Sequence, residues 1–258
     1  MPDRWNQIAA GYLKKAHPLS TQFARRLFQQ IPVRNDTLLL DIATGTGAAA
    51  IIAARYSPSV AAIDQSDAML AQLRQHEFDS IAAIRMDGHS LGFPGQCFDV
   101  VVSLFGIMLF QDWQQGLREM VRVTKVGGTC GLVVWASEKG AGLNQVIADC
   151  CDELGIELPE GPVPAGMKFL ADHNRLRQSL RSVGLSDVKV IEAEEVTSFR
   201  IDDAFEGNPF VSQLDQRDQQ AVLQTLRGKA LRAATSSGSS EHRIAVRAVA
   251  LMGIGTRR

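Results

Sequence analysis

The stretch LLDIATGTG, residues 39–47, combines residue types that could hold a ligand. An apolar run ends at Asp41, and Ala43, Gly45 and Gly47 follow, so few side chains fill the turn. Glycine permits a positive φ and a close approach of the backbone to a ligand. At the carboxyl end of a strand in an α/β sheet, such a turn indicates an adenosine-containing ligand. A tight turn that needs small residues only for packing stays an alternative.

Two further acids follow the next two apolar runs. Asp64 ends SVAAID and fits a partner for ribose hydroxyls, whereas Asp87 follows SIAAIRM and could accept from an adenine amino group. The glycine turn itself holds no Lys or Arg for phosphates. A cationic, phosphate-free adenosine suits two neighbouring acids better than a pyrophosphate does. Asp41 could brace the N–H groups of the turn or face that cation.

The same turn leaves a second ligand class open. GTGAAA satisfies the dinucleotide pattern G-x-G-x-x-G/A, and Asp64 would then be its ribose-binding acid. A nicotinamide-dependent oxidoreductase therefore remains an alternative, although the sequence has no Tyr-x-x-x-Lys pair.

The elements that must position these residues alternate between strand and helix. We expect apolar strands over 35–43, 59–64, 80–87, 98–106 and 127–136, with helices over 47–56, 65–76 and 111–124. This alternation indicates parallel βαβ units in a doubly wound α/β sheet. Two helices should precede the first strand, the first with Trp5 and Tyr12 on one face. After Trp135 we expect a helix over 173–185, a helix over 215–232 and long strands over 186–199 and 242–255.

Bulk composition excludes several classes of function. The chain has 258 residues, 45% of them hydrophobic, which is enough for one large α/β core. A net charge of -1 without a Lys/Arg block argues against a nucleic-acid partner. No apolar stretch approaches the roughly 20 residues that cross a bilayer. Four cysteines without a CxxC pair indicate reduced thiols in a cytoplasmic protein, and the five histidines show no metal spacing and should be structural or exposed.

Four stretches together resemble one known family. They are LLDIATGTG, VAAIDQSDAMLAQ, MDGHSLGFPGQCFDVVVSLFGIMLF and EMVRVTKVGGTCGLVVW. They resemble the class I S-adenosylmethionine-dependent methyltransferases, within them the branch of the ubiquinone/menaquinone biosynthesis methyltransferases. WNQIAAGY resembles the N-terminal helix of that branch, and the resemblance covers roughly residues 4–136. It implies a seven-stranded sheet of order 3-2-1-4-5-7-6 with the last strand antiparallel.

The resemblance also implies S-adenosylmethionine as the cofactor. Ala43, Gly45 and Gly47 would border its methionine part, and Ala43 stands where the family has its first loop glycine. Asp64 would take the ribose hydroxyls. Tyr12 would close over the cofactor from an N-terminal helical lid, residues 1–32.

Further contacts are implied on the adenine and sulfonium sides. Gln65 and Met69 would flank the adenosine, and Asp87 and Gly88 would meet the adenine. The sulfonium would lie beside the end of the fourth strand, at Leu104 and Phe105. Residues 33–258 would form the Rossmann-like catalytic domain, with cap inserts at about 137–175 and 200–242.

Methyl transfer from a sulfonium needs alignment in a dry pocket more than acid–base help. No base can be assigned, because six residues could lie near the pocket: Tyr12, His17, Asp112, Trp135, Glu138 and Asn144. The sequence therefore predicts a methyltransferase for a small-molecule acceptor in biosynthesis or secondary metabolism, as a monomer or homodimer. The alternatives are a cyclisation of the cofactor that releases methylthioadenosine, a cofactor-binding sensor and the oxidoreductase above.

Overall fold

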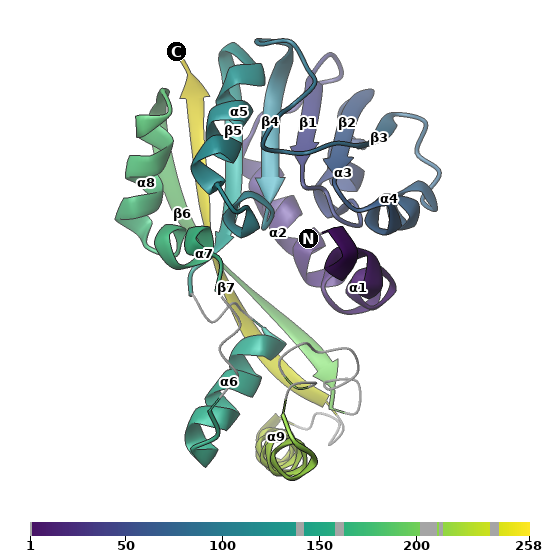
Figure 1. Cartoon of the computed structure of the whole chain (residues 1–258), viewed down its shortest axis with the longest axis vertical. Helices are drawn as coiled ribbons and strands as arrows, with labels where there is room; N and C mark the ends of the chain where they lie inside the picture. The colour runs from purple at the N-terminus through teal and green to yellow at the C-terminus, as the bar shows by residue number, and fades with distance from the viewer. Residues whose placement is uncertain (1, 138–141, 158–162, 202–210, 212–213, 238–242) are drawn as a thin grey trace. The chain divides into compact units, whose positions relative to one another are not determined.

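The computed structural model describes residues 2–137, 142–157, 163–201, 211, 214–237 and 243–258 (Figure 1). The chain divides into two compact units. Unit 1 comprises Met1–Ala136, Pro164–Ala193 and Ala250–Arg258, and unit 2 comprises Ser137–Val163 and Glu194–Val249. In the described residues, no helix is long and apolar enough to cross a membrane.

One sheet of seven strands has the order β3-β2-β1-β4-β5-β7-β6. The strands are β1 (Leu38–Ile42), β2 (Ser59–Asp64), β3 (Ile81–Arg85), β4 (Phe98–Leu104), β5 (Thr124–Trp135), β6 (Leu185–Arg200) and β7 (Arg243–Arg257). Strands β3, β2, β1, β4 and β5 are parallel neighbours, and β7 runs antiparallel to β5. The strand order and the antiparallel last strand implied by the resemblance are confirmed.

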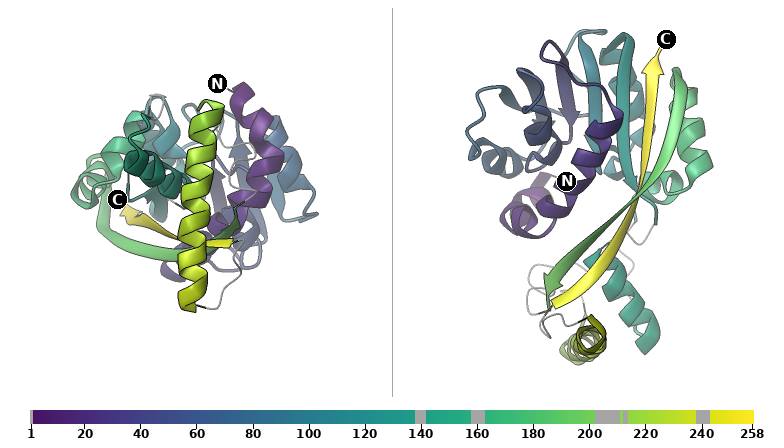
Figure 2. Two further views of the ribbon diagram at one scale, coloured as in Figure 1. Left: turned by 90° about the horizontal axis from the view of Figure 1, so that it is seen from below. Right: turned by 180° about the vertical axis from the view of Figure 1, so that it is seen from behind.

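Helices cover both faces of the sheet in unit 1 (Figure 1, Figure 2). They are α1 (Pro2–Lys15), α2 (His17–Gln30), α3 (Ala48–Ala53), α4 (Asp67–Arg74), α5 (Trp113–Val123), α7 (Ala165–Leu170) and α8 (His173–Ser182), with the 3-10 turn η1 (Ile107–Leu109). Because both faces are covered there, the central strands β1 and β4 read as nearly continuous apolar runs. Leu39, Leu40 and Ile42 of β1 are fully buried, as are Phe23 and Leu27 of α2.

The start of β5 differs from the sequence expectation. We expected the strand to begin at Gly127, but pairing with β4 begins at Thr124, and the register then shifts before Val100 pairs with Thr129. The glycines lie in this irregular stretch. A Cβ on Gly128 would come within 2.8 Å of the carbonyl oxygen of Asp99, so the backbones approach too closely for a side chain. Apolar periodicity cannot register such a bulge, because it carries no buried side chains.

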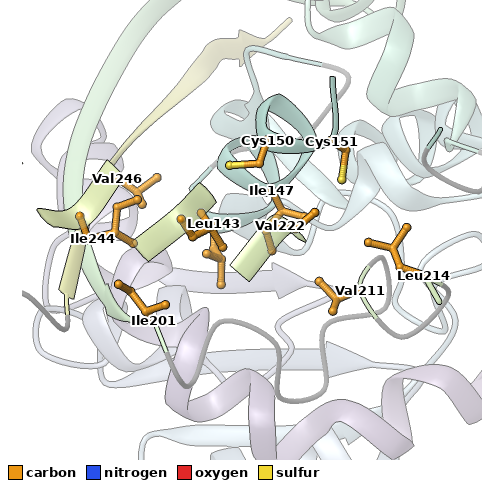
Figure 3. Packing of buried hydrophobic residues seen from close by; sticks show 12 residues of the cluster. Leu143, Ile147, Cys150, Cys151, Ile201, Val211, Leu214, Val222, Ile244 and Val246 are labelled. Carbon is orange, nitrogen blue, oxygen red and sulfur yellow. The ribbon is translucent and has the colours of Figure 1, made fainter. Parts of the chain in front are cut away.

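Unit 2 has an apolar core of its own (Figure 3). Its helices are α6 (Leu143–Leu154) and α9 (Gln216–Ser237), and residues of β6 and β7 from 194–200 and 243–249 complete it. Ile147 and Cys150 of α6 pack in one cluster with Val222 of α9 and Val246 of β7. Cys150 and Cys151 are buried and unbridged on a helix. The predicted helix over 215–232 corresponds to α9.

Candidate functional site

The turn after β1 is wound through three residues with positive φ. Ala43 has φ of 55°, Gly45 of 56° and Gly47 of 90°. The N–H of Thr44 donates to the carbonyl oxygen of Ile63 at 2.8 Å, which fastens the turn to β2. A Cβ on Gly47 would lie 2.2 Å from Leu73 Cδ1, so only glycine fits beside α4. The backbone of the turn is therefore held in a fixed shape with few side chains of its own.

Asp41 braces this turn from inside the sheet. Its side chain is buried, and Oδ2 accepts from the hydroxyl of Thr44 at 2.6 Å and from the N–H of Ala50 at 3.1 Å. Its other oxygen, Oδ1, has no hydrogen-bond partner. Burial raises the pKa of Asp41 to about 7, against the opposing hydrogen bonds from Thr44 and Ala50. The bracing role is seen directly, and a second carboxylate oxygen remains for a further charge or donor.

Asp64 ties the end of β2 to the same turn. Its Oδ2 accepts from the N–H of Gly45 at 2.8 Å, and its Oδ1 accepts from the N–H of Ser66 at 2.9 Å. Burial raises the pKa of Asp64, and the N–H groups of Ser66 and Gly45 act in the opposite direction. Each oxygen retains a lone pair for another donor. Asp64 therefore stands between the two loops at the carboxyl edge of the sheet.

Asp87, after β3, lies next to Gln65. One oxygen, Oδ1, accepts from Gln65 Nε2 at 2.7 Å, from the N–H of His89 at 2.9 Å, and pairs with His89 Nδ1 at 2.8 Å. Burial alone would raise the pKa of Asp87, but the hydrogen bonds from His89 and Gln65 hold it below its ordinary value. An ionised carboxylate is thus fixed beside the loop that carries Asp64.

Two residues of this region were not predicted. The sequence argument assigned His89 no role in the site, yet its ring bonds to Asp87 and packs at a tilt of 32° against Phe110, with centroids 4.5 Å apart. A Cβ on Gly88 would lie 2.5 Å from Phe110 Cζ, so that ring lies directly against the Gly88 backbone. The spacing Asp87-x-His89 was a usable signal, since an Asp side chain commonly bonds to groups two residues on. For Phe110 there was no local signal.

The end of β4 carries an aromatic cluster. The ring of Phe105 stacks on Trp135 with centroids 3.7 Å apart and meets Phe23 edge-on at 5.5 Å. Phe105 has φ of 59° and is buried, whereas Leu104 is half-buried. These two predicted sulfonium neighbours therefore lie in different surroundings, Phe105 among aromatic rings and Leu104 partly accessible.

Helix α1 reaches the glycine turn after β1. A Cβ on Gly45 would lie 3.9 Å from Tyr12 Cε1, which places the Tyr12 ring at the glycine turn. Burial raises the pKa of Tyr12, and the nearby charge of Asp64 adds to that rise. Met69, on α4, is buried, and the hydroxyl of Ser66 caps that helix by accepting from the N–H of Met69 at 3.1 Å.

The candidate bases of unit 1 make different contacts. His17 Nδ1 lies 2.8 Å from the hydroxyl of Thr46 in the glycine turn, and burial and then the nearby His76 lower the pKa of His17. Asp112 caps α5 by accepting from the N–H of Gln115 at 2.9 Å. Trp135 lies in the aromatic cluster and Asn144 in unit 2. Glu138 lies outside the described residues.

Comparison with known proteins decides which family this carboxyl-edge site belongs to. Residues 40–132 match the family described as "Methyltransferase domain". Over these residues the chain is similar to a methyltransferase domain. The match spans β1 to β5, and so includes Asp41, Asp64 and Asp87. Over these residues, the resemblance to the class I methyltransferases is confirmed.

Two curated relatives share the methyltransferase domain. The chain is 32% identical over 104 residues to the demethylmenaquinone methyltransferase of Corynebacterium glutamicum (strain R), covering 40% of this chain and 44% of the relative. It is 35% identical over 109 residues to the ubiquinone/menaquinone biosynthesis C-methyltransferase of Geobacter sulfurreducens, covering 39% of this chain and 43% of the relative. The chain therefore spans less than half the length of these two relatives.

A solved structure extends the likeness of fold beyond the methyltransferase domain. The YcgJ protein of Bacillus subtilis superposes with a TM-score of 0.62 at 15% identity, covering 91% of this chain and 97% of that protein. At this identity the likeness concerns the fold alone. In the described residues, no group of three or more His, Cys, Asp or Glu could hold a metal ion.

Proposed function

We propose that this chain is an S-adenosylmethionine-dependent methyltransferase that acts on a small-molecule acceptor in biosynthesis. The observation that carries the proposal is a pair of hydrogen bonds between loops at the carboxyl edge of the sheet. Asp64 accepts from the N–H of Gly45, and Gln65 donates to Asp87, so three successive loops are fixed against one another. Ligands of doubly wound sheets bind at this edge.

The residues at this edge fit an adenosyl sulfonium. Asp64, with a lone pair left on each oxygen, takes the ribose hydroxyls, and the free oxygen of Asp87 takes the adenine amino group beside Gly88. The methionine part lies along Ala43, Gly45 and Gly47, where the turn carries almost no side chains. Gln65 and Met69 flank the adenosine, and Leu104, Phe105 and Tyr12 border the sulfonium side.

The unpartnered Oδ1 of Asp41 supports a cationic ligand in particular. A buried carboxylate oxygen without a donor is unfavourable, and a positive charge nearby would offset that cost. When bound, the cofactor supplies an activated methyl group. The chain's own residues hold the adenosyl group, orient it and exclude water around it, and no proton transfer is assigned to any side chain.

The acceptor we propose is a quinone-type ring. Support comes from the two relatives, whose names assign them to demethylmenaquinone and to ubiquinone/menaquinone biosynthesis. We further propose that the protein works in the cytoplasm as a monomer or homodimer. Its four unbridged cysteines fit a reducing compartment.

The test is a product analysis with methyl-labelled S-adenosylmethionine. The purified chain is incubated with a reduced 1,4-naphthoquinone, with a catechol as a second acceptor, and with no acceptor. S-adenosylhomocysteine together with a labelled naphthoquinol supports the whole proposal, and label in the catechol alone supports methyl transfer but overturns the quinone assignment. Methylthioadenosine in the acceptor-free reaction would instead reveal cyclisation of the cofactor, and absence of any product with all acceptors would contradict the methyltransferase.

A further inference from the structure

A hydrogen bond joins α1 to the loop that follows β2. Asn6 Oδ1 accepts from the hydroxyl of Ser66 at 2.7 Å and from the N–H of Ala68 at 3.3 Å. The two partners are 60 and 62 residues away in the sequence. Helix α1 packs against α4, so the contact lies within one helix–helix interface of unit 1 (Figure 1).

This contact completes the cap of α4. The first N–H groups of a helix have no partner within it and must be satisfied from outside. Ser66 satisfies Met69 from within the same segment, and Asn6 satisfies Ala68 from another helix. The Ser66 hydroxyl donates its proton to Asn6 Oδ1 and accepts from the N–H of Met69. These two hydrogen bonds fix the orientation of the hydroxyl. Without Asn6, the second N–H of α4 and the Ser66 proton both lose their partner.

The capped end of α4 is also the ribose side of the proposed site. The N–H of Ser66 donates to Asp64 Oδ1, and Gln65, between them, donates to Asp87. At the other end of α1, Tyr12 lies at the glycine turn. Helix α1 therefore touches the loop after β2 through Asn6 and the turn after β1 through Tyr12.

We propose that Asn6 is a positioning residue, which fastens α1 over the two cofactor loops and thereby slows the escape of the bound adenosyl ligand. This inference rests on the proposed function only for its ligand, because the fastening itself exists in the ligand-free chain. Asn6 hydrogen-bonds to Ser66 and Ala68, neither of which is assigned to the cofactor. Its effect is exerted through Ser66, whose backbone holds Asp64.

The first experiment measures the fastening without any ligand. Amide hydrogen exchange over residues 2–15 is compared in wild type, Asn6→Ala and Asn6→Asp. Loss of one hydrogen-bonded anchor raises exchange about fivefold in Asn6→Ala, the factor that one neutral hydrogen bond supplies. Asn6→Asp keeps the acceptor oxygen at a helix N-terminus and should exchange like wild type. Gln7→Ala, the exposed neighbour on α1, is the matched truncation and should also exchange like wild type.

The second experiment measures dissociation of S-adenosylhomocysteine by stopped flow. The dissociation rate should rise about fivefold in Asn6→Ala, with wild-type rates in Asn6→Asp and Gln7→Ala. The Tm of Asn6→Ala should fall by about 2–4 °C, as the loss of one hydrogen bond implies. Unchanged exchange in Asn6→Ala, or faster exchange with an unchanged dissociation rate, would overturn the inference. If wild type binds no S-adenosylhomocysteine, the proposed function and the role in slowing ligand escape both fail, while the exchange data still decide whether Asn6 fastens α1.

Discussion

The methyl group of Ala43 occupies space that Gly106 leaves open. A Cβ on Gly106 would lie 2.5 Å from Ala43 Cβ and 2.9 Å from Ser103 Oγ. Ala43 stands in the left-handed region, with φ of 55°, at the position where the resembling family has its first loop glycine. The alanine in the turn after β1 is thus accommodated by a glycine in the loop after β4, across the carboxyl edge of the sheet.

This relationship predicts non-additive substitutions. Gly106→Ala should lower the free energy of unfolding by about 2 kcal/mol, because the added methyl overpacks a filled space. Ala43→Gly should be nearly neutral, since relief of left-handed strain offsets the added freedom of the unfolded chain. The double variant, Ala43→Gly with Gly106→Ala, should recover about half of the lost unfolding free energy. It should not recover all of it, because the new methyl still contacts Ser103. Urea unfolding of all four proteins measures this, and strictly additive values would contradict it.

The contact between Gly47 and Leu73 supplies a second prediction. Gly47→Ala combines a left-handed φ with a close contact to Leu73, and should cost about 3 kcal/mol of unfolding free energy. Gly184→Ala is the matched control, because Gly184 has φ of 98° but nothing within 4 Å of an added Cβ. It should cost only about 1 kcal/mol. Equal losses in the two variants, measured by urea unfolding, would show that Leu73 does not restrict the turn.

Because of Asp41, the free energy of unfolding should fall as pH rises from about 4 to about 7. Burial raises its pKa from an ordinary value of 3.8 to about 7 in the folded chain, so the folded state binds the proton more tightly than the unfolded state. The resulting stabilisation is fully present below pH 4 and is lost as pH rises to about 7, by about 1.4 kcal/mol per unit of pKa difference. Asp41→Asn should remove this slope. Urea unfolding of both proteins at pH 4.5, 6 and 8 measures it, and parallel curves would refute it.

The titration of Asp41 also predicts how affinity depends on the charge of the ligand. S-adenosylmethionine carries a sulfonium cation and S-adenosylhomocysteine does not. Above pH 7, where Asp41 is ionised, the affinity for the cation should rise relative to the neutral product by a few-fold. In Asp41→Asn the ratio of the two dissociation constants should stay flat with pH. Calorimetric titrations at pH 6 and 8 provide the ratio, and a ratio that rises equally in the variant would exclude Asp41 as its cause.

The parts of the fold that sequence alone predicted are those with a local physical signature. The central strands β1 and β4 are covered on both faces and read as nearly continuous apolar runs. Asp64 was predicted at a strand end because it closes the apolar run SVAAID, and β2 does end there. The expectation that Asp64 and Asp87 lie at neighbouring strand ends followed from the parallel order and agrees with the pairing of β2 with β3.

The parts that were missed depend on contacts between distant residues. Asn6 caps a helix that begins 61 positions later, and no residue near Asn6 in the sequence indicates this contact. Phe110 lies against Gly88 from a different loop, and an aromatic residue after a strand has many possible neighbours. The boundary of β5 was displaced because its irregular stretch exposes backbone instead of burying side chains. Local periodicity carries no information about such contacts.

The most direct test of the central claim is a titration of the chain with S-adenosylhomocysteine. Wild type should bind it one-to-one, and Asp64→Asn should bind it about 30-fold more weakly, the loss of one charge-assisted hydrogen bond. Asp99→Asn is the matched control, because Asp99 also accepts a backbone N–H, from Leu38 at 2.9 Å, but at the start of β4. It should bind like wild type. Absence of binding in wild type, binding of NADH in its place, or equal affinity in wild type and Asp64→Asn would contradict the account.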